Sequence, residues 1–509
     1  MNDCSWKIIS VMMKNIFLMV VAVTVIGISS GDGMASTIRV GAANIDITPR
    51  LPVALDGQMQ VRIAEKAETP VAAHVVVVES MLENKSSSVS LFVTCDIVTV
   101  PDELKEKIQA AVGKAIPGID TKKILINASH THTGGVVRDG WYTLPEGVTK
   151  VAAYQSFIAE NVAQAATSAW KNREPATVSW GMEYAKVAFN RRATYADGAA
   201  QMYGKTDRND FRGIEGYEDQ SVNSLFFWNL KGKLLAVCIN VASPAQIVEG
   251  RSAVNADYWH PVREKLKQRF GANLAVLGWI GAAGDQSPRP IYDQDADRRM
   301  LQLAVQDLKS NPKDEKADFR TDAYLEAIAS RIVNAVTATY ELVKNDQHKE
   351  IPFSHVVKTF DVQARIVTEK EKQECLKNIQ EIKSDPKKAI TNSRQIAWNQ
   401  EVVDRFERQK IQPNPQYSIE SHILRIGDIV ICTNPFELFT EFGIQLKARS
   451  KAQQTFIIQL VGPGTYVPTR KATEGGHYSA IVQSNRVGHE GGQQLVDKTL
   501  EFMDELWNE

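Results

Sequence analysis

The sequence alternates between apolar runs rich in β-branched and aromatic residues and segments in which apolar residues recur at helical spacing. Runs of the first kind, bounded by Gly, Pro, Asn or Asp, are typical of β-strands. Gly232 and Gly427 each lie between two such runs, where a tight hairpin turn needs the backbone angles that glycine adopts. Strands are therefore predicted over residues 88–100, 123–129, 176–185, 224–230, 233–242, 273–281, 421–427, 428–434 and 455–462.

The segments of helical spacing predict helices over residues 102–115, 150–170, 259–269, 322–343, 369–383 and 493–507. The polar segment from Arg289 to Lys316 predicts a surface loop, or else an excursion over a site. No Pro-, Gly- or Ser-rich linker divides the chain after residue 35. The pattern therefore predicts an α/β fold, with one large domain over residues 36–509 in which mixed β-sheets are flanked by helices.

The first 35 residues have a different pattern. Lys7 and Lys14 precede an uninterrupted apolar run over Ile16–Ile28, and small residues follow up to Ala35. This order predicts a secretory signal over residues 1–35, cleaved near Ala35, and hence a protein exported to the periplasm, the cell surface or the medium. An uncleaved membrane anchor is the alternative. No stable membrane span is expected after cleavage.

Composition narrows the classes of partner. The formal net charge of −1 provides no field that would attract a polyanion, so nucleic acid is not expected as a partner. The five cysteines lack the spacing of metal ligands, and those in apolar runs are expected to be small buried hydrophobes. Chemistry based on cysteine is therefore not predicted.

Four predicted strands end in tight, polar sequences: NASHTHTGG, VASPAQ, AAGDQSPRP and TNPFELFTEFG. In open α/β sheets, ligands bind at the carboxyl ends of strands, where loops meet at one edge of the sheet. We therefore expect these four strand ends to contribute to one shared site.

His130 and His132 are alternate residues in the first of these sequences. If the backbone stays extended there, their side chains point to opposite faces, so both cannot easily bind one metal ion. One is then a ligand and the other contacts substrate or holds the geometry. The alternative is that both histidines hydrogen-bond within a turn.

Glu437 and Ser287 lie in two other strand ends. Glu437 opens a helical pattern, ELFTEFGIQLKA, where a carboxylate is also expected simply to stabilise a helix N-terminus. Ser287 lies in a tight turn, GDQSP, where serine is common and a nucleophile is the less usual interpretation. A GxSxG motif is absent, so the nucleophile turn of α/β-hydrolases is not supported.

Six segments, in this order, resemble the neutral/alkaline non-lysosomal ceramidases: AANIDITPRLPVALDGQ, NASHTHTGG, FNRRATY, GAAGDQSP, RIGDIVICTNPFELFTEFG, and TYVPT followed by EGGHYSA. The resemblance covers about Ile38 to Glu509. It implies a large α/β domain around a deep zinc pocket, without the immunoglobulin-like domain that usually follows it. The implied reaction is hydrolysis of the ceramide amide by a zinc-activated water.

The resemblance also implies roles for particular residues. It implies three zinc ligands that differ in chemistry: His130, Glu437 and Tyr466. It implies four further residues that act in catalysis or line the site: His132, Arg191, Ser287 and Tyr478.

One position departs from the family pattern. The second zinc histidine is expected after the strand LLAVCINVA, where this chain has Pro244, with Gln246 close by. An amide oxygen is a poor substitute on zinc, which prefers nitrogen or sulfur ligands. Three accounts stay open: His477 or His260 fills the position, a harder metal with oxygen ligands replaces zinc, or the site holds no metal.

The predicted loops over residues 136–147, 190–198 and 287–299 mix Arg and Asp with Trp and Tyr. Such loops suit a polar ligand such as a sugar better than an alkyl chain, unless they are ordinary surface loops.

The first hypothesis, which follows from the resemblance, is an exported hydrolase of the ceramidase type that cleaves an amide or ester bond of a lipid.

The second hypothesis is a metal-free, exported carbohydrate-active enzyme or glycan-binding protein. In it, three arginines would bind the carboxylates of an acidic glycan: Arg138, Arg191 and Arg192. A third hypothesis is a relative that binds a ligand without catalysis.

Overall fold

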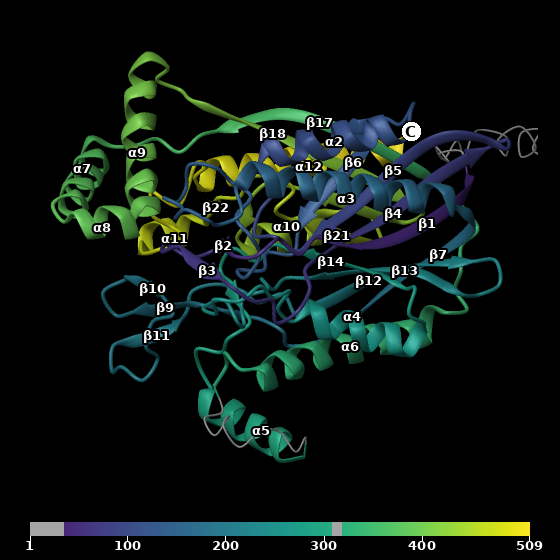
Figure 1. Ribbon diagram of the computed structural model, residues 1–509, viewed down its shortest axis with the longest axis horizontal. Helices are drawn as coiled ribbons and strands as arrows, with labels where there is room; N and C mark the ends of the chain where they lie inside the picture. The colour runs from purple at the N-terminus through teal and green to yellow at the C-terminus, as the bar shows by residue number, and fades with distance from the viewer. Residues whose placement is uncertain (1–34, 308–317, 509) are drawn as a thin grey trace, which may run out of the picture.

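The structure is a computed structural model that describes residues 35–307 and 318–508. The predicted secretory signal therefore lies outside the described residues except for Ala35. The described chain forms four layers: helices, a nine-stranded sheet, a four-stranded sheet and a second layer of helices (Figure 1). The predicted α/β fold with mixed sheets flanked by helices is confirmed.

The nine-stranded sheet has the order β14-β13-β12-β7-β1-β4-β5-β6, with β16 paired to β1. Most neighbours are antiparallel, but β13 and β14, and likewise β5 and β6, are parallel. The strands are β1 (Ser36–Asp46), β4 (Ala72–Leu82), β5 (Lys85–Cys95), β6 (Ile124–Ala128), β7 (Glu174–Tyr184), β12 (Ser221–Asn229), β13 (Leu234–Val241), β14 (Ala275–Ile280) and β16 (Glu350–Ile351).

The four-stranded sheet has the order β17-β18-β19-β21, and its last pair is parallel. Its strands are β17 (Phe353–Gln363), β18 (Gln416–Ile426), β19 (Ile429–Thr433) and β21 (Gln454–Ile458). Short strands form small ribbons outside these two sheets: β2 (Val53–Leu55) with β3 (Arg62–Ala64), β8 (Phe189–Asn190) with β15 (Gln286–Ser287), β9 (Arg192–Tyr195) with β10 (Ala200–Met202) and β11 (Phe211–Ile214), and β20 (Glu437–Leu438) with β22 (Tyr466–Val467).

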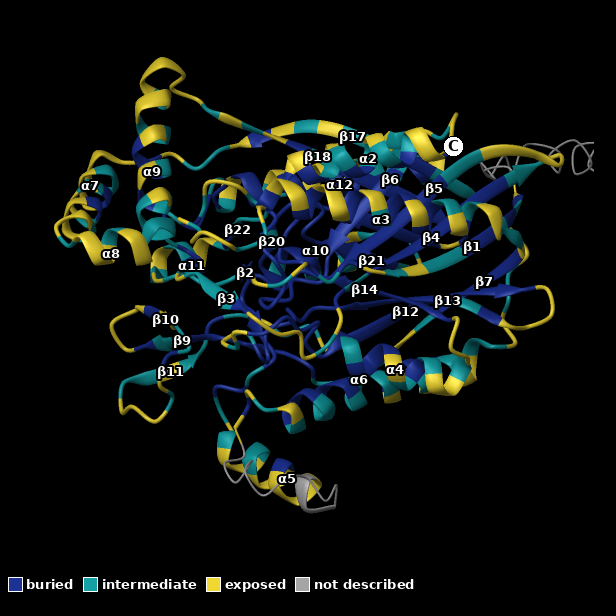
Figure 2. Ribbon diagram, in the orientation of Figure 1, coloured by how far each residue is buried: buried dark blue, intermediate teal, exposed yellow. Residues whose placement is uncertain are grey.

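Strand periodicity explains how the layers pack. In β19, Ile429 and Ile431 belong to the core between the two sheets, whereas Val430 and Cys432 belong to the core beneath the outer helices. Successive side chains of a strand point to opposite faces, so one apolar strand contributes to both cores. The sheets are buried on both faces (Figure 2), and their strands are therefore continuous apolar runs.

Two groups of helices cover the outer faces. On the large sheet lie α2 (Asp102–Ala115), α3 (Val151–Lys171), α4 (Trp259–Phe270) and α6 (Asp322–Val343). On the small sheet lie α10 (Thr440–Arg449) and α12 (His489–Asn508). Three further helices project beside the sheets, with exposed outer faces (Figure 2): α7 (Glu369–Lys383), α8 (Pro386–Thr391) and α9 (Ser393–Ile411). The remaining short elements are η1 (Thr121–Lys123) and α11 (Arg470–Gly475).

The predicted strands and helices are found with small changes at their ends, but one prediction is wrong. The surface-loop interpretation of the segment 289–316 is wrong, because α5 (Gln294–Asp307) occupies much of it. The alternative, an excursion over a site, agrees with the structure, since Gln294 and Arg298 line a large cavity. Asp295 and Asp297 lie in the first turn of α5, where acidic side chains stabilise a helix N-terminus. The polar composition of the segment therefore does not prevent a helix. Among the described residues, no helix is long and apolar enough to cross a membrane.

Candidate active site

The strand ends that carry polar sequences meet at one edge of the two sheets. His130 follows β6 of the large sheet, and Glu437 follows β19 of the small sheet, yet the His130 Nε2 lies 3.4 Å from the Glu437 Oε2. Gln246, which follows β13, lies with its amide Nε2 2.7 Å from the His132 Nε2. The Arg191 Nη2 donates to the carbonyl oxygen of Gly284, which follows β14, at 2.9 Å.

A short parallel ribbon aligns Glu437 with Tyr466. The two residues are direct partners in the β20–β22 pair. The expectation that Glu437 opens a helix is wrong, because α10 begins only at Thr440. Extended backbone at Glu437 directs its carboxylate towards the histidines instead of along a helix axis.

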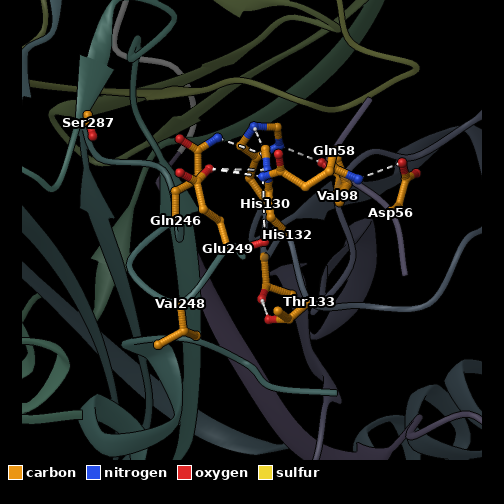
Figure 3. A network of polar contacts seen from close by, with 12 residues as sticks. Asp56, Gln58, Val98, His130, His132, Thr133, Gln246, Val248, Glu249 and Ser287 are labelled. Carbon is orange, nitrogen blue, oxygen red and sulfur yellow. Dashed lines mark hydrogen bonds and ion pairs between the residues drawn. The ribbon is translucent and has the colours of Figure 1, made fainter. Parts of the chain in front are cut away.

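The two histidines lie together, contrary to the expectation of opposite faces. His130 has a φ of +59°, which is the left-handed region and not an extended strand. This turn brings both rings to one side, with their Nε2 atoms 3.2 Å apart and their ring planes at 77° (Figure 3). A non-glycine residue held in this region is a feature that clusters at functional sites.

His130 is held by a hydrogen bond and by an ion pair. Its Nδ1 donates to the backbone oxygen of Val98 at 2.8 Å, which leaves the Nε2 directed at Glu437 and His132. Burial lowers the pKa of His130, but the Glu437 carboxylate and the hydrogen bond to Val98 together outweigh burial, so the pKa is raised overall. Burial raises the pKa of Glu437, and His130 and Arg191 lower it more. An imidazolium–carboxylate pair is therefore favoured.

His132 is in a different electrostatic environment. Burial, the neighbouring His130 and Arg62 all hold its pKa well below the usual value, so its ring is neutral. Its Nε2 accepts from the Gln246 amide, and its Nδ1 lies 3.7 Å from the Glu249 carboxylate. A Cβ at Gly57 would lie 2.4 Å from the His132 Cγ, so only glycine leaves room for this ring.

Arg191 and Tyr466 form the polar side of the cluster. Arg191 is only 3% exposed, and its Nη2 donates to the Tyr466 hydroxyl at 3.2 Å. Burial and the Glu437 carboxylate raise the pKa of Tyr466 well above its usual value, so the phenol keeps its proton. Tyr478 lies beside it, with the ring centroids 5.7 Å apart, and burial and Glu437 raise its pKa as well.

Two cavities meet at this cluster. The larger has a volume of about 1320 Å³, and charged side chains occupy much of its wall, among them Arg191, Glu249, Arg289 and Arg394. The smaller has a volume of about 80 Å³ and is lined by His130 and Glu437 together with residues of α9. The residues that line both cavities are Gly57, Met59, His132, Arg394, Tyr466 and Tyr478.

Ser287 lies apart from the histidines (Figure 3). Its Oγ accepts a hydrogen bond from the hydroxyl of Tyr203 at 3.1 Å, and Tyr203, not Ser287, lines the large cavity. Six of the seven predicted site residues are thus brought together at the cavities, and Ser287 lies one side chain behind them.

The residues at the cluster do not fit a tetrahedral zinc site. Within residues 35–307 and 318–508, no group of three or more His, Cys, Asp or Glu side chains could hold a metal ion. Pro244 contributes no ligand atom, and the Gln246 amide hydrogen-bonds His132. His477 does not fill the position, because its Nδ1 accepts from the backbone nitrogen of Met202. His260 lines a separate cavity.

Sequence reasoning missed several residues of the site. Arg289 and Tyr203 line the large cavity, with the Arg289 guanidinium 4.5 Å from the Tyr203 ring centroid. Arg394 and Trp398 come from α9, and no local pattern connects that helix with His130. The assignment of Arg192 to ligand binding is wrong, because its guanidinium is buried against Glu215 at 2.5 Å.

No protein-family model and no curated protein matches the chain. Solved structures do. A neutral ceramidase from Pseudomonas aeruginosa superposes with a TM-score of 0.64 at 15% identity, covering 92% of this chain and 75% of that one. The chain has the fold of the neutral ceramidases. A ceramidase complexed with C2 superposes with a TM-score of 0.62 at 14% identity, covering 92% and 76% of the two chains.

The neutral ceramidase fold accounts for the layers and for the common edge of the two sheets. The chemistry at that edge rests on this chain's own residues. Of these, the His130–Glu437 pair, the neutral His132 and the Arg191–Tyr466 contact are the groups that could act on a bound molecule.

Proposed function

We propose that this protein is a hydrolase that cleaves an amide or ester bond at the cluster around His130. One observation carries the proposal: a buried imidazolium–carboxylate pair, His130 with Glu437, lies 3.2 Å from a neutral imidazole, His132, at the junction of two cavities. Neighbouring titratable groups whose pKa values are driven apart are the usual mark of an acid and a base. The fold shared with neutral ceramidases supports a hydrolase.

The cluster supplies each group that such a hydrolysis needs. The attacking water takes the place of the Gln246 amide at the His132 Nε2 and gives a proton to that nitrogen, while the water oxygen bonds to the acyl carbon. Hydrogen bonds from the Tyr466 hydroxyl and the Arg191 guanidinium stabilise the oxyanion. The carbon–nitrogen or carbon–oxygen bond then breaks, and the His130 Nε2 proton passes to the leaving atom.

The test is a survey of purified protein against p-nitrophenyl esters and N-acyl aminocoumarin amides. We expect turnover that His130→Ala and Glu437→Gln each remove while the circular dichroism spectrum stays unchanged. His489→Ala is the matched control, since that histidine lies on α12 outside both cavities. No turnover on any of these bonds, or equal turnover in all variants, would contradict the proposal.

Zinc remains a prediction of the resemblance, and the mechanism above does not require it. Elemental analysis after purification in excess zinc measures it directly. One tightly held zinc ion per chain that His130→Ala loses would support the resemblance. We also propose export, on the pattern of residues 1–35, and sequencing of the mature N-terminus tests it.

A carbohydrate-active protein is the second candidate function, because the large cavity has charged walls. Among the described residues, Arg191 hydrogen-bonds a carbonyl and phenols and no carboxylate. A buried guanidinium in this state suits a ligand oxyanion such as the carboxylate of an acidic sugar. Calorimetric titration with oligogalacturonate and with neutral maltotriose tests it, and only the acidic ligand should bind.

A further inference from the structure

The residues proposed to act in hydrolysis are divided between the two cavities. Arg191 lines only the large cavity, whereas His130 and Glu437 line only the small one. His132 and Tyr466 line both. A bond that is cleaved at this cluster therefore has one substituent in each cavity.

Part of the wall of the small cavity is indole and aliphatic surface, beside polar and charged side chains. Helix α9 contributes Trp398, and Trp141 and Val98 lie on other sides. Charged groups of the same wall are bound to one another: the Arg486 Nε donates to the Glu401 carboxylate at 2.6 Å. With these charges paired, the exposed remainder of the wall suits an alkyl group.

The wall of the small cavity is also firmly held. The guanidinium carbons of Arg138 and Arg394 lie 4.3 Å and 4.6 Å from the ring centroid of Trp141, one from each of two chain segments. Arg138 also donates to the backbone oxygen of Pro463 and to the Thr99 hydroxyl. A long chain could enter only by displacing groups that have their own partners.

The large cavity does not suit an alkyl chain. Its wall holds the ion pair of Arg289 with Glu249 at 2.6 Å, next to the guanidinium of Arg191. Covering such groups with an alkyl chain would remove them from water without new hydrogen bonds, which is costly. A polar body fits there instead, and the acyl group belongs in the small cavity.

We propose that the substrate is a polar molecule carrying a short acyl group, from acetyl to butyryl in length. This rests on the proposed hydrolase. The polar body occupies the large cavity and the acyl group occupies the small one, beside Trp398. Water adds to the acyl carbon, the bond to nitrogen or oxygen breaks, and the products are a short carboxylic acid and a free amine or alcohol.

The rate test compares kcat/KM on p-nitrophenyl acetate, butyrate and octanoate, with the rate of His130→Ala subtracted. We expect acetate or butyrate to exceed octanoate at least tenfold. Trp398→Ala should raise the octanoate-to-acetate ratio at least fivefold. Trp170→Ala is the matched control, a half-buried tryptophan of α3 outside both cavities, and should leave the ratio unchanged. A preference for octanoate in the wild type would overturn the proposal.

A binding test examines the fit of a short acyl group in the small cavity without relying on turnover. Butyramide and octanamide are titrated into the wild-type protein and followed by tryptophan fluorescence. Each further methylene that finds room tightens binding severalfold, so equal or weaker binding of octanamide shows that the cavity ends. Octanamide binding more than tenfold tighter, or no binding of butyramide, overturns the proposal. Loss of turnover with short-chain binding retained overturns only the proposed hydrolase.

Discussion

Two pairs of buried histidines make nearly the same contact in different parts of this molecule. The Nε2 atoms of His130 and His132 are 3.2 Å apart, and the His355 Nε2 lies 3.0 Å from the His422 Nδ1. All four rings are almost fully buried. A contact between imidazoles is therefore not what distinguishes a reactive site.

The surroundings of the two pairs differ. His355 and His422 lie within the paired strands β17 and β18, and the other ring nitrogen of His355 hydrogen-bonds the Ser90 hydroxyl at 2.7 Å. Burial, with the charge of Lys105, lowers the pKa of His422 to about 3. Glu437 instead raises the pKa of His130. A carboxylate and a cavity make the first pair suited to catalysis, whereas His355 and His422 form no ion pair with a carboxylate of the described residues and line neither of these two cavities.

The largest expected effect is on catalysis. His130→Ala removes the proposed acid and the partner of Glu437, so kcat should fall about 10²–10⁴-fold. His355→Ala, measured well below its melting temperature, should keep kcat within a factor of about three of the wild type. Initial rates on the best ester of the survey check both. Equal losses in the two variants would remove the distinction between the pairs.

The structural pair should dominate stability. His422→Ala leaves the His355 ring without its partner inside a sheet, which should cost about 2–3 kcal/mol of unfolding free energy. Urea unfolding followed by circular dichroism measures this. His130→Ala is the comparison and should cost less, since its site is bordered by cavities that admit water. A smaller loss at His422 than at His130 would contradict the comparison.

Acid should weaken the fold through the structural pair. In the unfolded chain a histidine has a pKa of about 6.5, whereas the folded pKa of His422 is about 3. The unfolded state therefore binds the proton first, so the stability that this group contributes is full above about pH 6.5 and falls as the pH drops. Between pH 7 and pH 5 the loss is about 2 kcal/mol. His422→Leu should lose correspondingly less over that range, and urea titrations at both pH values test it.

The smallest expected effect is at Ser287. Because its hydroxyl contacts Tyr203 and does not line either cavity, Ser287→Ala should lower kcat/KM less than about tenfold. A fall as large as that of His130→Ala would instead indicate a nucleophile. Mass spectrometry of protein mixed with p-nitrophenyl acetate would then detect an acyl group on the serine.

Local pattern predicted much of the fold. The helix over 102–115 was predicted to the residue, because its apolar residues Leu104, Ile108 and Val112 recur at helical spacing and face the core. The hairpin turns at Gly232 and Gly427 were predicted as well, since both glycines have positive φ, +74° and +61°. The central strands β1 and β4 were missed, although β4 contains the run Val75–Val78 and a two-residue turn at Glu83 and Asn84, both with positive φ, joins it to β5.

The candidate site could be predicted only as a set of residues. Of the seven residues that the resemblance named, six line one or both cavities and Ser287 lines neither, and the roles of all seven stay predictions. Arg394 and Trp398 could not be predicted, because α9 lies more than 250 residues from His130 along the chain and meets it only through packing. Gln246 was noticed only as a poor zinc ligand, and its hydrogen bond to His132 joins the segments that follow β13 and β6, which are not neighbours in the sheet.

By itself, the sequence determined most of the strands and helices, because these follow from periodicity within a few turns of the chain. Only the tertiary structure decided that the imidazoles of His130 and His132 face one another. That arrangement depends on a positive φ at His130, which no local pattern requires. The same holds for the separation into a large cavity and a small one that contains the indoles of Trp141 and Trp398, because helices and loops distant in the chain close them.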